Sequence, residues 1–189
     1  MIAFCRHGQT APNRDGLLLG RADPPLTGAG ARQAEQLSAR LASEPIVAVL
    51  TSPLQRARDT AAAIASATGC AVEVDERLVE IHYGEWDGLS FAELPPDLVA
   101  MWRRDPAFAP PGGESLLDVE ARMGATTGEL LGRAGNGVVV AVSHVSPIKA
   151  AVSWALGTGP ELAWRMRLDV ASITRIAPGP TLLSFNERA

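Results

Sequence analysis

Residues 138–147 read VVVAVSHVSP, and this stretch indicates the kind of fold to expect. Its first five residues are apolar and mostly β-branched, which is typical of a strand buried on both faces of a parallel sheet. Ser146 and Pro147 then favour the start of a helix, because serine caps helices and proline fits the first helical position. A buried strand that runs directly into a helix is the repeating unit of an α/β fold.

Short apolar runs and helical patterns alternate along the rest of the chain. The other expected strands cover residues 2–5, 46–50, 71–74, 172–176 and 181–185. Pro178, Gly179 and Pro180 separate the last two runs, which we expect to form a hairpin. The alternation predicts a three-layer α/β/α sandwich, with a mostly parallel sheet and an antiparallel edge strand.

The helices have recognisable start and stop signals. Thr27 and Ser115 are expected caps, the latter together with Asp118. For the helix after residues 46–50, we expect Ser52 to cap, Pro53 to be the first helical residue and Gln55 to complete a capping box. Gly69 is expected to end that helix. We expect the helices after Ser52 and Ser146 to direct free backbone N–H groups toward one edge of the sheet.

The composition favours one globular domain over residues 1–189. The chain has a formal net charge of −4 and 47% hydrophobic residues, and it contains only two cysteines. Such a domain needs no disulfide or metal to stabilise its core. Mild acidity argues against a nucleic-acid partner, and no run approaches the ~18 apolar residues of a membrane helix. Charge appears too early, at Arg6, for a signal peptide, so we expect a cytoplasmic location.

Histidines and arginines follow three of the expected strands. Arg6 and His7 come directly after the first, and His144 follows residues 138–142. Arg56 lies in the first helical turn after residues 46–50. Because the carboxyl ends of parallel strands meet at one edge of a sheet, we expect these side chains to lie together. Arginines bind a phosphoryl group bidentately, and they lower the pKa of a neighbouring imidazole, which then stays neutral and nucleophilic.

A leaving alkoxide also needs a proton, and Glu80 is the expected donor. It follows the strand at 71–74 in a partly apolar segment, where a carboxyl group can serve as a general acid. Glu85 and Asp87 are rival acids, and spacing alone does not decide between the three.

Four ordered motifs resemble those of the histidine phosphatase superfamily, in its phosphoglycerate-mutase-like branch. They cover residues 6–10 with Asn13, 52–61, 78–88 and 142–144, and the connectors at 20–27 and 111–115 are also similar. The resemblance extends over nearly the whole chain and implies a phosphoglycerate-mutase-like fold. After His144, residues 145–147 depart from the glycines that many members carry.

The resemblance implies a role for each matching residue. His7 would be the nucleophile and carry a transient phosphohistidine, and Glu80 would protonate the leaving group and then activate water. The phosphate pocket would consist of Arg6, Arg56 and His144, with Asn13 as an additional donor. Arg21 is either a substrate-side cation or an ordinary loop arginine. No metal and no cofactor is implied.

The compact length and residues 85–88 make the chain more similar to phosphatases than to the longer mutases. The resemblance is to α-ribazole-phosphatase-like and broad acid phosphatases, which implies a small phosphate ester as substrate. Residues 83–113 are the irregular part, and we expect them to form a variable lid over the substrate. Similar members are sometimes fused behind a ribonuclease H domain. Because the first strand starts beside Met1, we expect no such domain here.

Three other functions stay open at this point. The chain could be a phosphotransfer mutase, or a non-catalytic module that binds a phosphorylated ligand. A zinc hydrolase using His7, His144 and Glu80 is a weaker alternative, because the adjacent arginines would repel a dication. The oligomeric state is also open, and a homodimer is one option.

Overall fold

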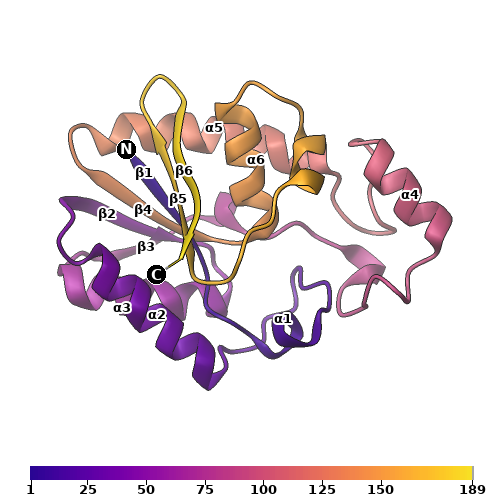
Figure 1. Ribbon diagram of the computed structural model, residues 1–189, viewed down its shortest axis with the longest axis horizontal. Helices are drawn as coiled ribbons and strands as arrows, with labels where there is room; N and C mark the ends of the chain where they lie inside the picture. Colours follow the sequence, from indigo (N-terminus) through magenta and orange to yellow (C-terminus); the bar gives the residue numbers. More distant parts are fainter. Residues whose placement is uncertain (189) are drawn as a thin grey trace.

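The computed structural model describes residues 1–188, which are built around one six-stranded sheet (Figure 1). The strands are β1 (Ile2–Arg6), β2 (Ile46–Thr51), β3 (Val72–Val74), β4 (Val138–Ser143), β5 (Ser172–Ala177) and β6 (Thr181–Arg188). Their order in the sheet is β3-β2-β4-β1-β5-β6. The first four strands are parallel, whereas β5 is antiparallel to β1 and β6 is antiparallel to β5. The predicted mostly parallel sheet is confirmed, and its antiparallel edge is a two-stranded hairpin.

Helices cover both faces of this sheet, which confirms the three-layer arrangement (Figure 1). One face carries α2 (Gly28–Leu41) and α3 (Gln55–Thr68), and the other carries α5 (Leu116–Ala134) and α6 (Val145–Ala155). The shorter helices are α1 (Ala11–Asp15), α4 (Pro96–Arg104), η1 (Glu76–Leu78), η2 (Gly84–Trp86) and η3 (Pro160–Arg165). Among residues 1–188, none of the helices combines the length and hydrophobicity needed to cross a bilayer.

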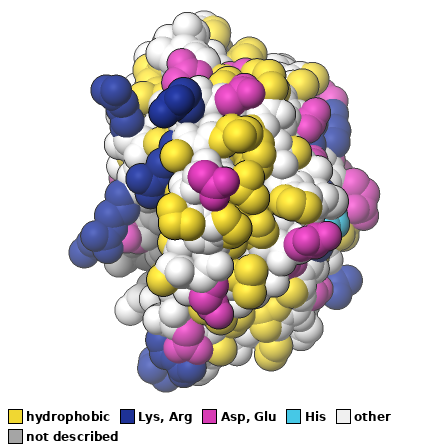
Figure 2. Space-filling view, turned by 90° about the vertical axis from the view of Figure 1, so that its right-hand side faces the viewer, with side chains coloured by type: hydrophobic (Ala, Val, Ile, Leu, Met, Phe, Trp, Pro, Cys, Tyr) yellow, Lys and Arg dark blue, Asp and Glu magenta, His cyan; other side chains and the backbone are white. Residues whose placement is uncertain are grey.

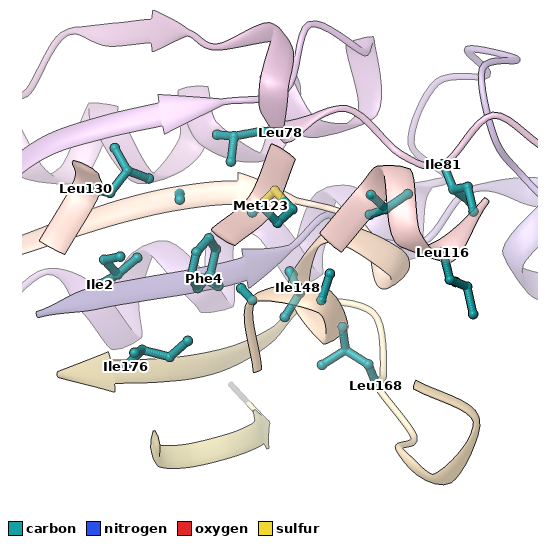
Figure 3. Close-up of a cluster of buried hydrophobic side chains, with 14 of the residues drawn as sticks. Ile2, Phe4, Leu78, Ile81, Leu116, Met123, Leu130, Ile148, Leu168 and Ile176 are labelled. Atoms are coloured by element: carbon teal, nitrogen blue, oxygen red, sulfur yellow. The ribbon is translucent and has the colours of Figure 1, made fainter. Parts of the chain in front are cut away.

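Alternate side chains of the central strands supply two separate cores. Ile2 and Phe4 pack with Met123 of α5 on one face (Figure 3), while Ala3 and Cys5 pack toward α2 and α3. Full burial of a side chain such as Phe4 contributes about 1.5–3 kcal/mol to stability. Apolar packing on both faces therefore fixes the carboxyl ends of β1 and β4, where the expected reactive residues begin.

The start of α3 differs from the prediction. The helix begins at Gln55 without a side-chain cap, so the capping box expected from Ser52 is wrong. The Ser52 hydroxyl instead lies 2.7 Å from Nε2 of His144. The backbone N–H of Gln55 donates to the carboxylate of Asp23, at 2.8 Å. A partner from a distant loop thus replaces the local cap.

Other helix boundaries agree better with the sequence pattern. Thr27 caps α2, and Ser115 with Asp118 forms the predicted capping box of α5. Gly69 ends α3 with a positive φ of 72°, which glycine adopts without steric cost. Helix α6 starts at Val145 with His144 as its N-cap residue, two residues earlier than the expected cap at Ser146 and first helical residue at Pro147. The short helices α1 and α4 were not predicted, because neither has enough residues to display a clear apolar period.

Candidate active site

Strand pairing brings His7, which follows β1, next to His144, which follows β4. Arg6 of β1 lies opposite Ser143 of β4, so the next residues along each strand, His7 and His144, are neighbours. The backbone N–H of His7 donates to the carbonyl of Ser143 at 3.1 Å. The two imidazole rings lie 5.0 Å apart between centroids, tilted by 56°. The juxtaposition results from the sheet register and needs no special loop.

The ring of His7 is oriented by its own loop. Nδ1 lies 2.7 Å from the carbonyl oxygen of Gly8, and because a carbonyl only accepts, Nδ1 carries the proton. Nε2 therefore holds the lone pair. Burial, and then the positive charges of Arg6 and Arg56, lower the pKa of His7 well below its usual 6.5. The imidazole is neutral at pH 7, as a nucleophile must be.

Arg56 is held by backbone carbonyls. Its side chain is completely buried, and its two terminal nitrogens donate to the carbonyls of Ala22 at 2.7 Å and Gly20 at 2.8 Å. Burial lowers the pKa of Arg56, while the carboxylates of Glu80 and Asp23 oppose this shift. Its Nε has no partner among residues 1–188. A buried donor without a partner is costly, and an anionic ligand can satisfy it.

The loop that grips Arg56 is itself organised by Asp87. The carboxylate of Asp87 accepts hydrogen bonds from the backbone N–H groups of Gly20, Arg21 and Ala22, at 2.8–2.9 Å. It thereby fixes the carbonyls of Gly20 and Ala22 in the direction of Arg56. Asp87, a rival acid in the sequence, is therefore placed as a support of this loop. The second rival, Glu85, is exposed.

Arg6 contributes a second guanidinium beside His7. One of its terminal nitrogens donates to the carbonyl of Leu168 at 2.6 Å, and its buried Nε has no partner in the described part of the chain. Burial lowers the pKa of Arg6 to about 10. That value still leaves the group charged at neutral pH, so Arg6 and the buried Arg56 place two fixed positive charges beside His7.

Glu80 occupies the N-terminus of α6. One of its carboxylate oxygens accepts from the backbone N–H groups of Ile81 at 2.9 Å and Ser146 at 3.1 Å. The other oxygen accepts from Val145 at 3.0 Å. Free N–H groups were expected at this helix end and at that of α3. Instead, Glu80 accepts from Val145 and Ser146, and Asp23 accepts from Gln55 of α3, because a helix N-terminus stabilises negative charge.

His144 is, like Arg56, completely enclosed by the protein. It is fully buried, its Nε2 shares a hydrogen bond with Ser52, and its Nδ1 has no partner within residues 1–188. Burial, followed by the charge of Arg56, lowers the pKa of His144 well below 6.5. The role of Ser52 was not expected, and the proline after it had suggested a helix cap instead.

A cavity of about 240 Å³ opens in front of His7. Of the expected site residues, the cavity is lined by Arg6, His7, Asn13 and Glu80. The side-chain oxygen of Asn13 accepts from the N–H and hydroxyl of Thr10, so the remaining donors of Asn13 are on its amide nitrogen. Arg56 and His144 are completely buried beside this wall and do not line the cavity.

Arg21 lies apart from these residues. It does not line the cavity, and its guanidinium pairs with Glu114, with 3.1 Å between nitrogen and oxygen. The same carboxylate accepts from the backbone N–H of His82 at 2.8 Å. The structure thus places Arg21 in a network that ties the connector at 20–27 to the segment before α5.

Another part of the cavity wall is apolar and aromatic. Trp102 of α4 meets Trp164 of η3 edge to face, with ring centroids 4.6 Å apart. Phe91 and Leu17 extend this wall, and Phe91 is 43% exposed. Figure 2 faces the end of the molecule that carries α1 and α4, where hydrophobic side chains run down the middle of the surface. The irregular segment 83–113 therefore contributes directly to the cavity.

Two functional groups of the cavity wall were not expected from the sequence. They are the indole of Trp164 and the ammonium group of Lys149, the single lysine of the chain. Lys149 lies on α6, five residues after His144. A cation on a helix that starts at the site was the signal that could have identified it.

The sequence matches the histidine phosphatase superfamily (branch 1) over residues 2–186. The chain belongs to this superfamily. It is 40% identical over 177 residues to a bifunctional protein of Mycobacterium tuberculosis, an alignment that covers 92% of this chain and 49% of that relative. This histidine phosphatase chain thus spans about half the length of that relative.

Solved structures agree with this membership. A mycobacterial glucosyl-3-phosphoglycerate phosphatase in complex with VO3 superposes with a TM-score of 0.89 at 31% identity, covering 98% of both chains. A phosphoserine phosphatase from Entamoeba histolytica in complex with 3-phosphoglyceric acid gives a TM-score of 0.91 at 28% identity, with 98% and 96% coverage. The predicted family and fold are therefore confirmed, and both of these structural relatives are named phosphatases.

Proposed function

We propose that this chain is a metal-independent phosphomonoesterase that hydrolyses a small phosphate ester through a phosphohistidine on His7. The observation that carries the proposal is the state of His7. Its Nδ1–H is fixed on the carbonyl of Gly8, which leaves the Nε2 lone pair available beside Arg6 and Arg56 at a cavity wall. The phosphatase names of the structural relatives support the same reaction class.

In the first step, Nε2 of His7 attacks phosphorus in line with the ester oxygen. An N–P bond forms as the P–O bond to the alcohol breaks, and Glu80 gives its proton to the leaving oxygen. Arg6 binds the equatorial oxygens, on which charge is spread in the transition state, and Asn13 adds a hydrogen bond from its amide nitrogen. Arg56 and His144 do not line the cavity, so we propose that the phosphoryl group reaches their unpartnered Nε and Nδ1 atoms when the ester is bound.

In the second step, Glu80 acts as the general base. Its carboxylate removes a proton from water, the water oxygen attacks phosphorus, and the N–P bond breaks to release inorganic phosphate and neutral His7. Glu80 is then protonated again for the next turnover. It is only 3% exposed and lines the same cavity as His7, which supports a role in both steps.

We also propose that residues 1–189 form a single histidine phosphatase domain in which 83–113 is a variable lid and substrate segment. Support comes from Trp102, which this segment places in the cavity wall, and from the contact of Trp102 with Trp86 at 5.5 Å between centroids. The segment is connected to the phosphate end through Asp87, which organises the loop that holds Arg56.

The test is hydrolysis of p-nitrophenyl phosphate and a panel of alkyl phosphates in the presence of EDTA. The proposal predicts phosphate release that the chelator does not reduce. Activity that requires added zinc would overturn it. Isomerisation of phosphoglycerates that outpaces phosphate release would favour the mutase alternative, and tight binding of a phosphorylated ligand without turnover would favour the binding module.

A further inference from the structure

Lys149 lies on the cavity wall as a cation without a counter-ion. Its Nζ donates to the carbonyl of Ala163 at 2.9 Å, which uses one of its three N–H donors. Among residues 1–188, no carboxylate oxygen lies within ion-pair distance of this nitrogen, although most arginines of the chain have such partners. It is also the only lysine of the chain.

The carboxylate whose charge acts on Lys149, that of Glu80, already has other hydrogen-bond partners. Glu80 attracts the Lys149 charge, but both oxygens of Glu80 accept backbone hydrogen bonds at the start of α6. Burial lowers the pKa of Lys149, and the positive charge of Arg6 adds to this effect. An ammonium group that is partly removed from water and lacks a paired anion is unfavourable, so an anionic group entering the cavity would be stabilised there.

The rest of this wall offers few other groups that could bind such an anion. Arg6 and Lys149 are the cations that line the cavity in the described structure, and Arg6 lies beside the nucleophile. Burial raises the pKa of Tyr83, so its hydroxyl stays uncharged, and Trp102 and Trp164 present aromatic surfaces. The cavity therefore combines a phosphate end, an apolar and aromatic wall, and one additional positive charge on α6.

We propose that Lys149 is a specificity-determining residue that binds a carboxylate on the alcohol part of the substrate. The aromatic wall then packs on the apolar body that joins this carboxylate to the phosphate. The substrate class is a phosphomonoester with one additional carboxylate on an apolar or aromatic alcohol. The inference rests on the proposed phosphatase function and deepens it.

Aryl phosphates that differ in one group provide the test. Phenyl phosphate is compared with 3- and 4-carboxyphenyl phosphate and with 4-carbamoylphenyl phosphate, whose amide has nearly the carboxylate's shape without its charge. Lys149→Met should lower kcat/KM for a carboxyphenyl ester about 10- to 100-fold more than for the two uncharged esters, because the variant removes one partner of a desolvated ion pair. Lys149→Arg should restore most of this preference.

A matched control separates local charge from overall charge. Arg165→Met removes an exposed cation from η3, the 3₁₀-helix that also holds Ala163, and should leave the substrate preference unchanged. If Lys149 only ties α6 to η3, Lys149→Met will lower kcat/KM for all four esters by the same factor, and the inference is overturned. A wild-type enzyme that hydrolyses phenyl phosphate without any Lys149-dependent preference for carboxylates overturns it while leaving the proposed function intact.

A binding measurement covers the case in which no ester is hydrolysed. Failure to hydrolyse any ester overturns the proposed function. Calorimetric titration with benzyl phosphonate and with 3- and 4-carboxybenzyl phosphonate then tests Lys149 alone. Tighter binding of a carboxylated compound that disappears in Lys149→Met supports the inference, and equal affinities for all three compounds contradict it.

Discussion

The two ends of the cavity are held in place by different forces. At the phosphate end, backbone groups grip the side chains: two loop carbonyls hold Arg56, and the N-terminus of α6 holds Glu80. At the other end, Trp102 and Trp164 are positioned by ring packing and by no hydrogen bond of their indole nitrogens within residues 1–188. Hydrogen bonds fix the positions of reacting atoms to fractions of an ångström, whereas apolar packing tolerates exchange of one apolar side chain for another. Substitutions at the first end should therefore change kcat, and those at the second should change KM and stability.

The largest expected effect is that of His7→Ala. Loss of the nucleophile should lower kcat for p-nitrophenyl phosphate by about 10⁴-fold or more, which steady-state assays would measure. The control is His82→Ala, since His82 does not line the cavity and accepts a hydrogen bond from Gly84. Its kcat should stay within about fivefold of the wild type. Near-normal activity of His7→Ala would show that His7 is not the nucleophile and would contradict the role given to the phosphate end.

Glu80→Gln should have the next largest effect, and the effect should depend on the leaving group. Hydrolysis of glycerol phosphate should slow by about 10²- to 10³-fold, because an alkoxide needs protonation, and p-nitrophenyl phosphate should slow by less than about tenfold. Glu85→Gln, at an exposed carboxylate of η2, is the matched control. Equal slowing of both substrates would contradict the role of Glu80 as the acid.

Trp102→Ala tests the apolar end. Removal of this buried ring should destabilise the fold by about 3–5 kcal/mol, measured by urea unfolding. KM for aryl phosphates should rise more than kcat falls, which is the reverse of the pattern expected for Glu80→Gln. A variant that keeps its KM but loses kcat would show that the two ends are not separate in function.

The sequence predicted the phosphate end better than the apolar end for a physical reason. His7 and His144 come directly after strands whose burial is visible as continuous apolar runs, and parallel register places the residues beyond such strands at one edge of the sheet. Trp102 and Trp164 come from short elements that meet only through tertiary packing, so no local period reveals them. The N-termini of α3 and α6 were predicted wrongly because carboxylates distant in sequence fill them.

The smallest expected effect concerns pH. Burial lowers the pKa of His7 and His144 well below 6.5. Both imidazoles therefore stay unprotonated in the folded protein as the pH falls, whereas in the unfolded chain both histidines bind protons. Stability should therefore fall as pH drops below 6.5, by up to about 1.4 kcal/mol per pH unit for each histidine. Urea unfolding at pH 7.5 and 5.5 measures this change, and His144→Asn should reduce it. If His144→Asn leaves the loss of stability between pH 7.5 and 5.5 unchanged, the result contradicts a buried, neutral imidazole at His144.

The most direct test of the central claim is to locate the phosphoryl group during turnover. The Glu80→Gln variant is mixed with a phosphate ester, quenched in alkali, where phosphohistidine is stable, and digested for mass spectrometry. We predict phosphate on the peptide that contains His7, at its imidazole, and none when the His7→Ala change is added. Phosphate on another residue, or one that persists in the double variant, would contradict it.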